Sequence, residues 1–154
     1  MVRTLILVLC LVSFLSCNKD EEDEQKQFQK DIALIEAYLL DNGLIADRTA
    51  SGLHYIITDT GSGTSYPGPN SQVTVGYKGY FLDGQVFDQS QPGQPISFFL
   101  NQVIKGWPEG MQLFRKGGKG VLLLPSKLAY GANPPSESIH PYAVMIFDVE
   151  LVDF

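Results

Sequence analysis

The chain of 154 residues is poor in the side chains that most enzymes use for chemistry. It contains two cysteines, Cys10 and Cys17, near the N-terminus and two isolated histidines, His54 and His140, so no spacing typical of a zinc site is present. The Gly-x-Ser-x-Gly element of many hydrolases is absent as well. Residues 117–120, Gly-Gly-Lys-Gly, lack the flanking positions of a phosphate-binding loop and are typical of a turn. We therefore expect neither a metal ion nor a cofactor.

Long apolar runs are confined to the N-terminus. Arg3 precedes an apolar stretch over residues 5–12, a pattern typical of a secretory signal and short for a membrane span, although an uncleaved anchor is the alternative. The segment Phe14-Leu15-Ser16-Cys17 resembles a bacterial lipobox, with Phe14 where Leu is usual. The resemblance implies a signal peptide over residues 1–16, lipid attachment at Cys17 and export to the outer membrane of a Gram-negative bacterium. After cleavage Cys17 would be the only cysteine left, which suits an oxidising compartment.

Basic residues are too few and too scattered for binding nucleic acid. Residues 18–47 hold three lysines against nine acids, whereas residues 48–154 hold seven basic residues against eight acids. The acidity therefore belongs to the N-terminal part, chiefly to residues 20–24. We interpret residues 17–26 as an acidic, solvated tether. The run also resembles the acidic export signal that follows the lipidated cysteine in surface lipoproteins of some Gram-negative bacteria.

Hydrophobic periodicity predicts a helix over residues 25–42, and we assign 27–43 as the N-terminal helical unit. Its apolar stripe, with spacings of four, three and four residues, consists of Phe28, Ile32, Ile35 and Leu39. Gly43 is a reasonable stop signal. The stripe must pack on something, either its own domain or a partner. We expect a monomer in which the helix docks locally or serves as a spacer.

From residue 53 onward the hydrophobic period changes to two. Strands are predicted over residues 53–58, 73–78, 120–124 and 143–152, with a short apolar stretch at 96–100 and a hairpin turn at Asp83-Gly84. Pro108 can open a short helix over 109–114. These elements predict an α+β fold: an antiparallel β-sheet wrapped around a short central helix and preceded by one N-terminal helix. Ile57 is expected in the core, and His54 and His140 on the surface.

Five ordered segments between residues 51 and 154 carry a family resemblance. They are Val75-Gly76-Tyr77-Lys78-Gly79-Tyr80, Phe87-Asp88-Gln89-Ser90, Val103-Ile104-Lys105-Gly106-Trp107, Pro125-Ser126-Lys127-Leu128-Ala129-Tyr130-Gly131 and Phe147-Asp148-Val149-Glu150-Leu151. The set resembles the FKBP-type peptidyl-prolyl cis-trans isomerases and assigns residues 48–154 to an isomerase domain. The resemblance implies proline-containing polypeptides as substrates and macrolides such as rapamycin as inhibitors.

The same resemblance implies the site residues. The catalytic pocket would consist of Tyr77, Phe87, Asp88, Trp107, Tyr130 and Phe147. Val103, Ile104 and Ile139 would bind substrate, the last through its backbone N–H. Two departures from the family are Ile96, where an aromatic residue is common, and the loop 132–141, which has no glycine and carries His140 in place of a common proline.

Several interpretations remain open from the sequence. Any single Trp or Phe of the set, taken alone, is more often ordinary core than pocket, whereas a carboxylate such as Asp88 gains nothing from burial unless it is paired. Rotation about an Xaa-Pro bond needs no acid, base or cofactor, which agrees with what the sequence lacks. An active isomerase is the favoured function. A non-catalytic peptide-binding module or holdase chaperone on the same fold, and a purely structural surface lipoprotein, are the alternatives.

Overall fold

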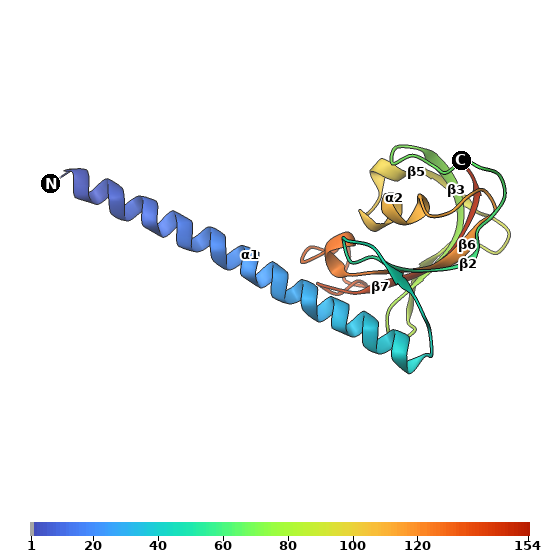
Figure 1. Cartoon of the computed structure of the whole chain (residues 1–154), viewed down its shortest axis with the longest axis horizontal. Helices are drawn as coiled ribbons and strands as arrows, with labels where there is room; N and C mark the ends of the chain where they lie inside the picture. The colour runs from blue at the N-terminus through green and yellow to red at the C-terminus, as the bar shows by residue number, and fades with distance from the viewer. Residues whose placement is uncertain (1) are drawn as a thin grey trace.

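The computed structural model describes the backbone of residues 2–154 and the side chains of residues 19–154. An antiparallel sheet curves around a short helix, and a long helix lies on the outer side of the sheet (Figure 1). The elements are α1 Val2–Asp41, β1 Asp47–Arg48, β2 His54–Asp59, β3 Gln72–Tyr80, β4 Val86–Gln89, β5 Ile96–Phe99, η1 Leu100–Gln102, α2 Gly106–Met111, β6 Lys119–Leu124, η2 Ser126–Leu128 and β7 Met145–Asp153. The predicted α+β architecture is confirmed.

The sheet has the order β1-β2-β6-β7-β3-β4, and β5 pairs with β3 beside β4. All the pairings are antiparallel. On β7, alternate side chains face the concave side, where Met145, Phe147, Val149 and Leu151 join the main core. Helix α2 fills this side, and Gly110 allows it to approach the sheet because a Cβ there would collide with the Leu122 side chain.

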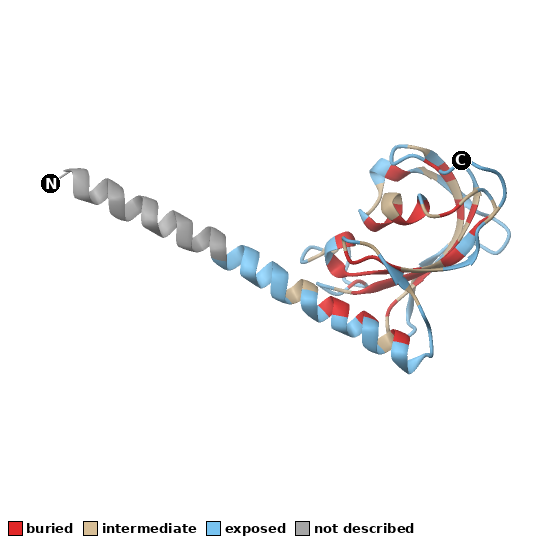
Figure 2. Cartoon of the chain, in the orientation of Figure 1, coloured by how far each residue is buried: buried red, intermediate tan, exposed pale blue. Residues whose placement is uncertain are grey.

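The C-terminal half of α1 packs against the convex face of the sheet. Ile35 and Leu39 form a second apolar cluster with Leu123, Val144 and Ile146. Among the described residues 19–41 of α1, Figure 2 shows the buried positions near the C-terminal end of the helix. Of the predicted stripe, Ile32, Ile35 and Leu39 are buried and Phe28 is half-buried, so the helix docks on its own domain.

The predicted acidic tether over 17–26 differs in its structure from expectation, because this stretch is part of α1. Its described side chains from Lys19 to Lys26 are exposed, as expected, and Lys26 pairs with Glu22 one turn earlier at 2.8 Å. Such pairs four residues apart favour the helix. The predicted signal peptide over 1–16 and Cys17 lie outside the residues whose side chains are described. Among residues 19–154, no helix combines the length and the apolar character that crossing a bilayer requires.

Three smaller expectations were wrong. The central helix begins at Gly106 and ends at Met111, so Pro108 lies inside the first turn, where its missing N–H still costs nothing. Ile57 is 38% exposed, because its position near the end of β2 extends past the core. His54 is buried at 4% exposure, since α1 covers the face of β2 to which it points, whereas His140 is exposed as expected.

Candidate active site

A cavity of about 530 Å³ opens on the concave side of the sheet, between β3, β4, β5 and helix α2. Its lining residues are Tyr77, Phe87, Asp88, Ile96, Phe98, Gln102, Val103, Ile104, Trp107, Tyr130 and Phe147. Trp107 is 5% exposed and Phe147 4% exposed, so both are largely buried at the base of the cavity, while Tyr130 stands at its mouth at 39% exposure. The cavity is therefore apolar at its base and half-open to solvent.

The aromatic rings contact one another mainly edge to face. The Trp107 ring lies 5.3 Å from Tyr77, 5.2 Å from Phe98 and 5.2 Å from Phe147, with interplanar angles of 87°, 81° and 70°. Phe87 meets Phe147 at 5.6 Å and 87°. Aromatic pairs prefer this geometry, and the network holds each ring in place by contacts with the others. The cavity thus has preformed aromatic walls.

One residue of β3 explains why two of these rings can lie so close to the strand. Gly79 pairs with Asp88 of β4 on one side and with Phe147 of β7 on the other. A Cβ at Gly79 would stand 2.7 Å from the Phe87 ring and 2.9 Å from the Phe147 ring. The glycine in the Val75–Tyr80 motif therefore makes room for the wall of the cavity.

The Asp88 carboxylate has a hydrogen-bond partner, as expected of a carboxylate that stands beside an apolar cavity. The Tyr77 hydroxyl donates a hydrogen bond to Asp88 Oδ2 at 2.6 Å, across the edge of the cavity. Burial and the Asp88 carboxylate raise the pKa of the Tyr77 hydroxyl well above its usual value near 10. The phenol therefore stays protonated and keeps donating at neutral pH. Together with Gln102 and Tyr130, this pair forms the polar part of a largely aromatic and aliphatic lining.

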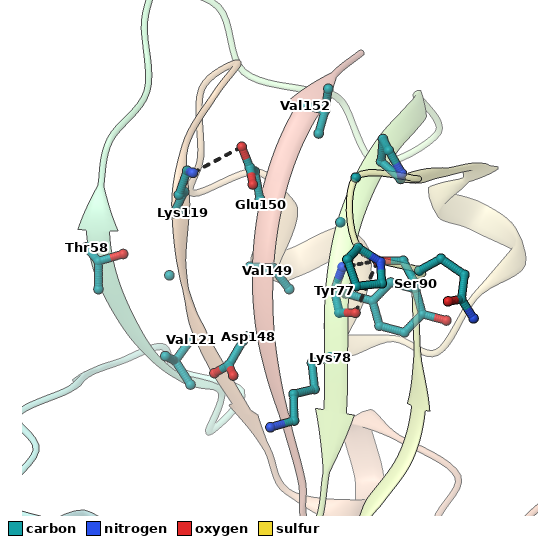
Figure 3. Close-up of a pocket in the computed structure, with 16 residues that line it drawn as sticks. Thr58, Tyr77, Lys78, Ser90, Lys119, Val121, Asp148, Val149, Glu150 and Val152 are labelled. Carbon is teal, nitrogen blue, oxygen red and sulfur yellow. Dashed lines mark hydrogen bonds and ion pairs between the residues drawn. The ribbon is translucent and has the colours of Figure 1, made fainter.

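Ser90, the residue after β4, fixes the backbone of Tyr77 from the neighbouring strand. Its Oγ accepts the Tyr77 N–H at 3.0 Å, and its own backbone N–H donates to the Tyr77 carbonyl at 3.0 Å. Figure 3 shows this contact at the rim of a second hollow, of about 770 Å³, on the convex face. That hollow is larger, but it is an open sheet face whose Lys119 and Glu150 pair with each other at 3.2 Å. It offers no comparable aromatic enclosure.

The cavity brings together eight of the nine residues that the resemblance assigned to catalysis and substrate binding. Ile139 is the exception: it is buried in the main core, and its N–H donates to the Ser136 carbonyl at 3.2 Å. Its contact with substrate stays a prediction. Phe98 and Gln102 line the cavity although the sequence analysis did not assign them. Strand alternation over Ile96–Phe99 is too short to decide whether Phe98 or Phe99 faces inward.

Comparison with known proteins agrees with this geometry. Residues 63–152 match the family model described as FKBP-type peptidyl-prolyl cis-trans isomerase. The chain belongs to this family. The match contains β3, β4, α2, β6 and nearly all of β7, and so every residue that lines the cavity. The matched range therefore contains the whole cavity.

Individual relatives within the FKBP-type family support the same assignment. A probable FKBP-type isomerase FkpA from Neisseria meningitidis is 45% identical over 120 residues, which are 76% of this chain and 44% of that protein. The crystal structure of FkpA from Escherichia coli has a TM-score of 0.70 at 35% identity, covering 98% of this chain and 70% of that one. A peptidyl-prolyl cis-trans isomerase from Pseudomonas syringae has a TM-score of 0.71 at 31% identity, covering 83% and 92%. The chain spans about half the length of the curated relatives that it matches.

Proposed function

We propose that this chain is a peptidyl-prolyl cis-trans isomerase that accelerates rotation about Xaa-Pro bonds in exported polypeptides. The observation that carries the proposal is the aromatic cavity over Trp107, whose apolar base can receive a prolyl ring and whose opening at Tyr130 leaves room for a continuing polypeptide. Proline is the residue for which the cis form is both common and slow to interconvert. The family membership of the chain supports the same reaction.

The proposed mechanism is stabilisation of a twisted imide by an environment poor in water. Resonance keeps the peptide bond planar with a barrier of about 18–20 kcal/mol, and the twisted state loses that resonance. Its carbonyl is then less polar than in the planar ground state. An apolar aromatic cavity destabilises the planar, polar form more than the twisted form. Each ~1.4 kcal/mol of this preference raises the rate of isomerisation tenfold. No proton is transferred at any step.

Phe87 and Asp88 have separate roles in this proposal. Phe87 packs edge to face on Phe147 and forms one wall for the prolyl ring. Asp88 accepts the Tyr77 hydroxyl and fixes the ring that lies against Trp107, at the edge where the carbonyl before proline would stand. Val103 and Ile104 supply the aliphatic part of the lining, and the macrolide inhibitors of the family are expected to compete for the same space.

A protease-coupled or refolding-coupled prolyl isomerisation assay tests the function. We expect Phe87→Ala and Asp88→Ala each to lower kcat/KM by roughly tenfold or more, the loss of about 1.4 kcal/mol of transition-state stabilisation. Both variants should remain folded, because Phe87 is only half-buried and Asp88 is exposed. Full activity in both would refute the site.

A scaffold variant provides the control for that assay. Leu151→Ala removes a fully buried side chain of the same core that does not line the cavity, at a cost of roughly 2–5 kcal/mol in stability. Activity per folded molecule should be unchanged. If the unaltered protein has no activity on several Xaa-Pro peptides but still binds them, the non-catalytic peptide-binding module or holdase is the correct function.

We further propose that the chain is exported and held at the outer membrane of a Gram-negative bacterium by a lipid on Cys17. The lipobox-like sequence Phe14-Leu15-Ser16-Cys17 and the apolar segment before it support this proposal. In cells, Cys17→Ser should abolish fatty-acid labelling and release the protein from the membrane fraction, whereas Cys10→Ser should change neither. Unchanged labelling of Cys17→Ser would contradict the anchor.

A further inference from the structure

The segment that carries Tyr130 to the mouth of the cavity is a tight turn after β6. Ser126 begins the short helix η2 and is 2% exposed. Its carbonyl accepts two backbone hydrogen bonds, from Ala129 N–H at 3.0 Å and from Gly131 N–H at 2.9 Å. These two residues flank Tyr130 directly, so the position of the Tyr130 backbone depends on where Ser126 is held.

Ser126 is held by a carboxylate from α1. Asp31 has no exposed surface, and its Oδ2 accepts both the Ser126 N–H at 2.8 Å and the Ser126 Oγ–H at 2.6 Å. Gln27, one turn earlier on α1, donates its Nε2–H to Asp31 Oδ1 at 2.6 Å. All the contacts are short and involve a charged acceptor, which is the stronger class of hydrogen bond.

A second contact between the same two elements lies beside this one. The Lys127 ammonium stands 3.3 Å from the centre of the Phe28 ring on α1, a cation–π contact. Helix α1 thus contacts two consecutive residues of η2 through Asp31 and Phe28. Its apolar residues Ile35 and Leu39 pack about one to two turns further along, on the convex face of the sheet. The contacts of α1 with η2 and its apolar packing on the sheet are separate attachments.

The chemistry of the Asp31–Ser126 hydrogen bonds suggests that they do more than hold the helix in place. Apolar packing attaches α1 at lower cost, because a buried carboxylate must be desolvated and then fully hydrogen-bonded. A buried polar network that is fully satisfied instead fixes one geometry. The geometry fixed here is that of the turn leading to Tyr130, which lines both the prolyl cavity and a hollow of about 600 Å³ between α1 and this turn.

We propose that Asp31 is a positioning residue of the active site, which acts through Ser126 to place Tyr130 at the mouth of the cavity. Asp31 does not line the prolyl cavity and touches no bound substrate in this scheme. The proposal rests on the proposed isomerase function for its activity readout. It gives α1 a role in catalysis, and this role is independent of the apolar stripe that docks the helix.

A double-mutant cycle between Asp31 and Tyr130 tests the proposal. We expect Asp31→Ala to lower kcat/KM per folded molecule about tenfold, because small misplacements of a site residue carry losses of this size or larger. In a Tyr130→Ala background, Asp31→Ala should cause no further loss. Asp31→Asn should restore most of the activity, since its oxygen can still face Ser126 and Gln27 can rotate its amide to accept from the new NH₂ group.

Ile35→Ala is the matched control. It removes a fully buried side chain of the same helix that belongs to the apolar cluster on the sheet, so it should lower stability and leave kcat/KM per folded molecule unchanged. Wild-type activity in Asp31→Ala, or an equal loss with and without Tyr130, would overturn the proposal. So would an equal loss of activity in Ile35→Ala, because the effect would then belong to helix docking in general.

Trp107 gives a readout that needs no turnover. It is the single tryptophan of the chain and lies at the base of the cavity. Acrylamide should quench its emission more strongly in Asp31→Ala than in the unaltered protein or in Ile35→Ala, because a displaced Tyr130 leaves the mouth wider. Unchanged quenching would contradict the positioning role even if the protein proved inactive, so failure of this proposal and failure of the isomerase proposal are distinguishable.

Discussion

Asp88 and Tyr77 illustrate how a single hydrogen bond serves two residues. Before the contact is known, a carboxylate directly after a cavity-wall phenylalanine has two plausible roles, to face the substrate carbonyl or to hold a neighbouring tyrosine. The 2.6 Å bond from the Tyr77 hydroxyl to Asp88 Oδ2 shows that it holds the tyrosine. Since the pKa of Tyr77 is raised by burial and by Asp88, this bond persists far above neutral pH. Alkaline conditions up to about pH 9 should therefore not disrupt the pair.

His54 is the residue whose environment the sequence did not reveal. Its position in a strand that alternates apolar and polar residues indicates an exposed face, but α1 covers that face. The ring is buried, and its Nδ1–H donates to the Gly52 carbonyl at 3.0 Å. Burial lowers the pKa of His54 below the usual value near 6.5, an effect that the bond to Gly52 partly opposes. The histidine is therefore neutral in the folded protein at neutral pH.

This environment predicts a pH-dependent stability. Between the lowered pKa of the folded state and the value near 6.5 of the unfolded chain, the unfolded chain binds more protons. The free energy of unfolding should then fall as the pH falls below about 6.5. His54→Asn can keep a donor for the Gly52 carbonyl and does not titrate, so its stability should change less over the same range. Denaturant unfolding at pH 7.5, 6.5 and 5.5 measures this, and parallel curves for the two proteins would contradict it.

At the scale of secondary-structure elements, hydrophobic periodicity and turn residues predicted the longer strands and the hairpin turn correctly. The period-two segments became β2, β3, β6 and β7, and Asp83-Gly84 forms the turn between β3 and β4, where the Gly84 N–H donates to the Phe81 carbonyl at 2.9 Å. The two-residue strand β1 was missed because so short a segment has no period. It exists because β2 offers its free edge to Asp47 and Arg48.

Element order in the sheet could not be read from the sequence. β2 pairs with β6 and β3 pairs with β7, so two of the neighbouring pairs in the sheet come from distant parts of the chain. Such pairings follow from how the whole apolar surface is buried, which hydrophobic periodicity does not record. The Asp31–Ser126 contact joins residues 95 positions apart and was missed for the same reason. The residues of the cavity were predictable only because several motifs together carried a family resemblance.

Helix α1 was predicted with the correct stripe, but the extent of its docking had to come from the structure. Ile32, Ile35 and Leu39 are buried, whereas Leu34 and Leu40, which widen the apolar face in sequence, are 41% and 80% exposed. The difference arises because a helix resting on a single sheet buries one side only. At the scale of elements, α1 is thus an integral part of the domain over its C-terminal half and an exposed extension over residues 19–26.

At the scale of the whole molecule, the arrangement of α1 bears on its oligomeric state. A helix that used its stripe to dimerise would leave Ile35 and Leu39 free in the isolated chain. Here both side chains are buried in the second apolar cluster, against β6 and β7. The large apolar side chains that stay exposed around the end of the helix are Leu34, Leu40, Leu44 and Ile45. Stable interfaces bury roughly 800 Å² on each partner, well beyond what four scattered side chains supply.

We therefore predict that the soluble chain without its first 17 residues is a monomer. Sedimentation velocity and equilibrium should give the mass of one chain, with no dependence on concentration over a hundredfold range. Ile35→Ala, in which Leu39 and the Asp31 contact still hold the helix on the domain, should give the same monomer mass. A tight dimer of the unaltered protein would contradict the prediction, and its interface would then be sought on the exposed residues at the end of α1 or on the open convex face beside Lys119 and Glu150.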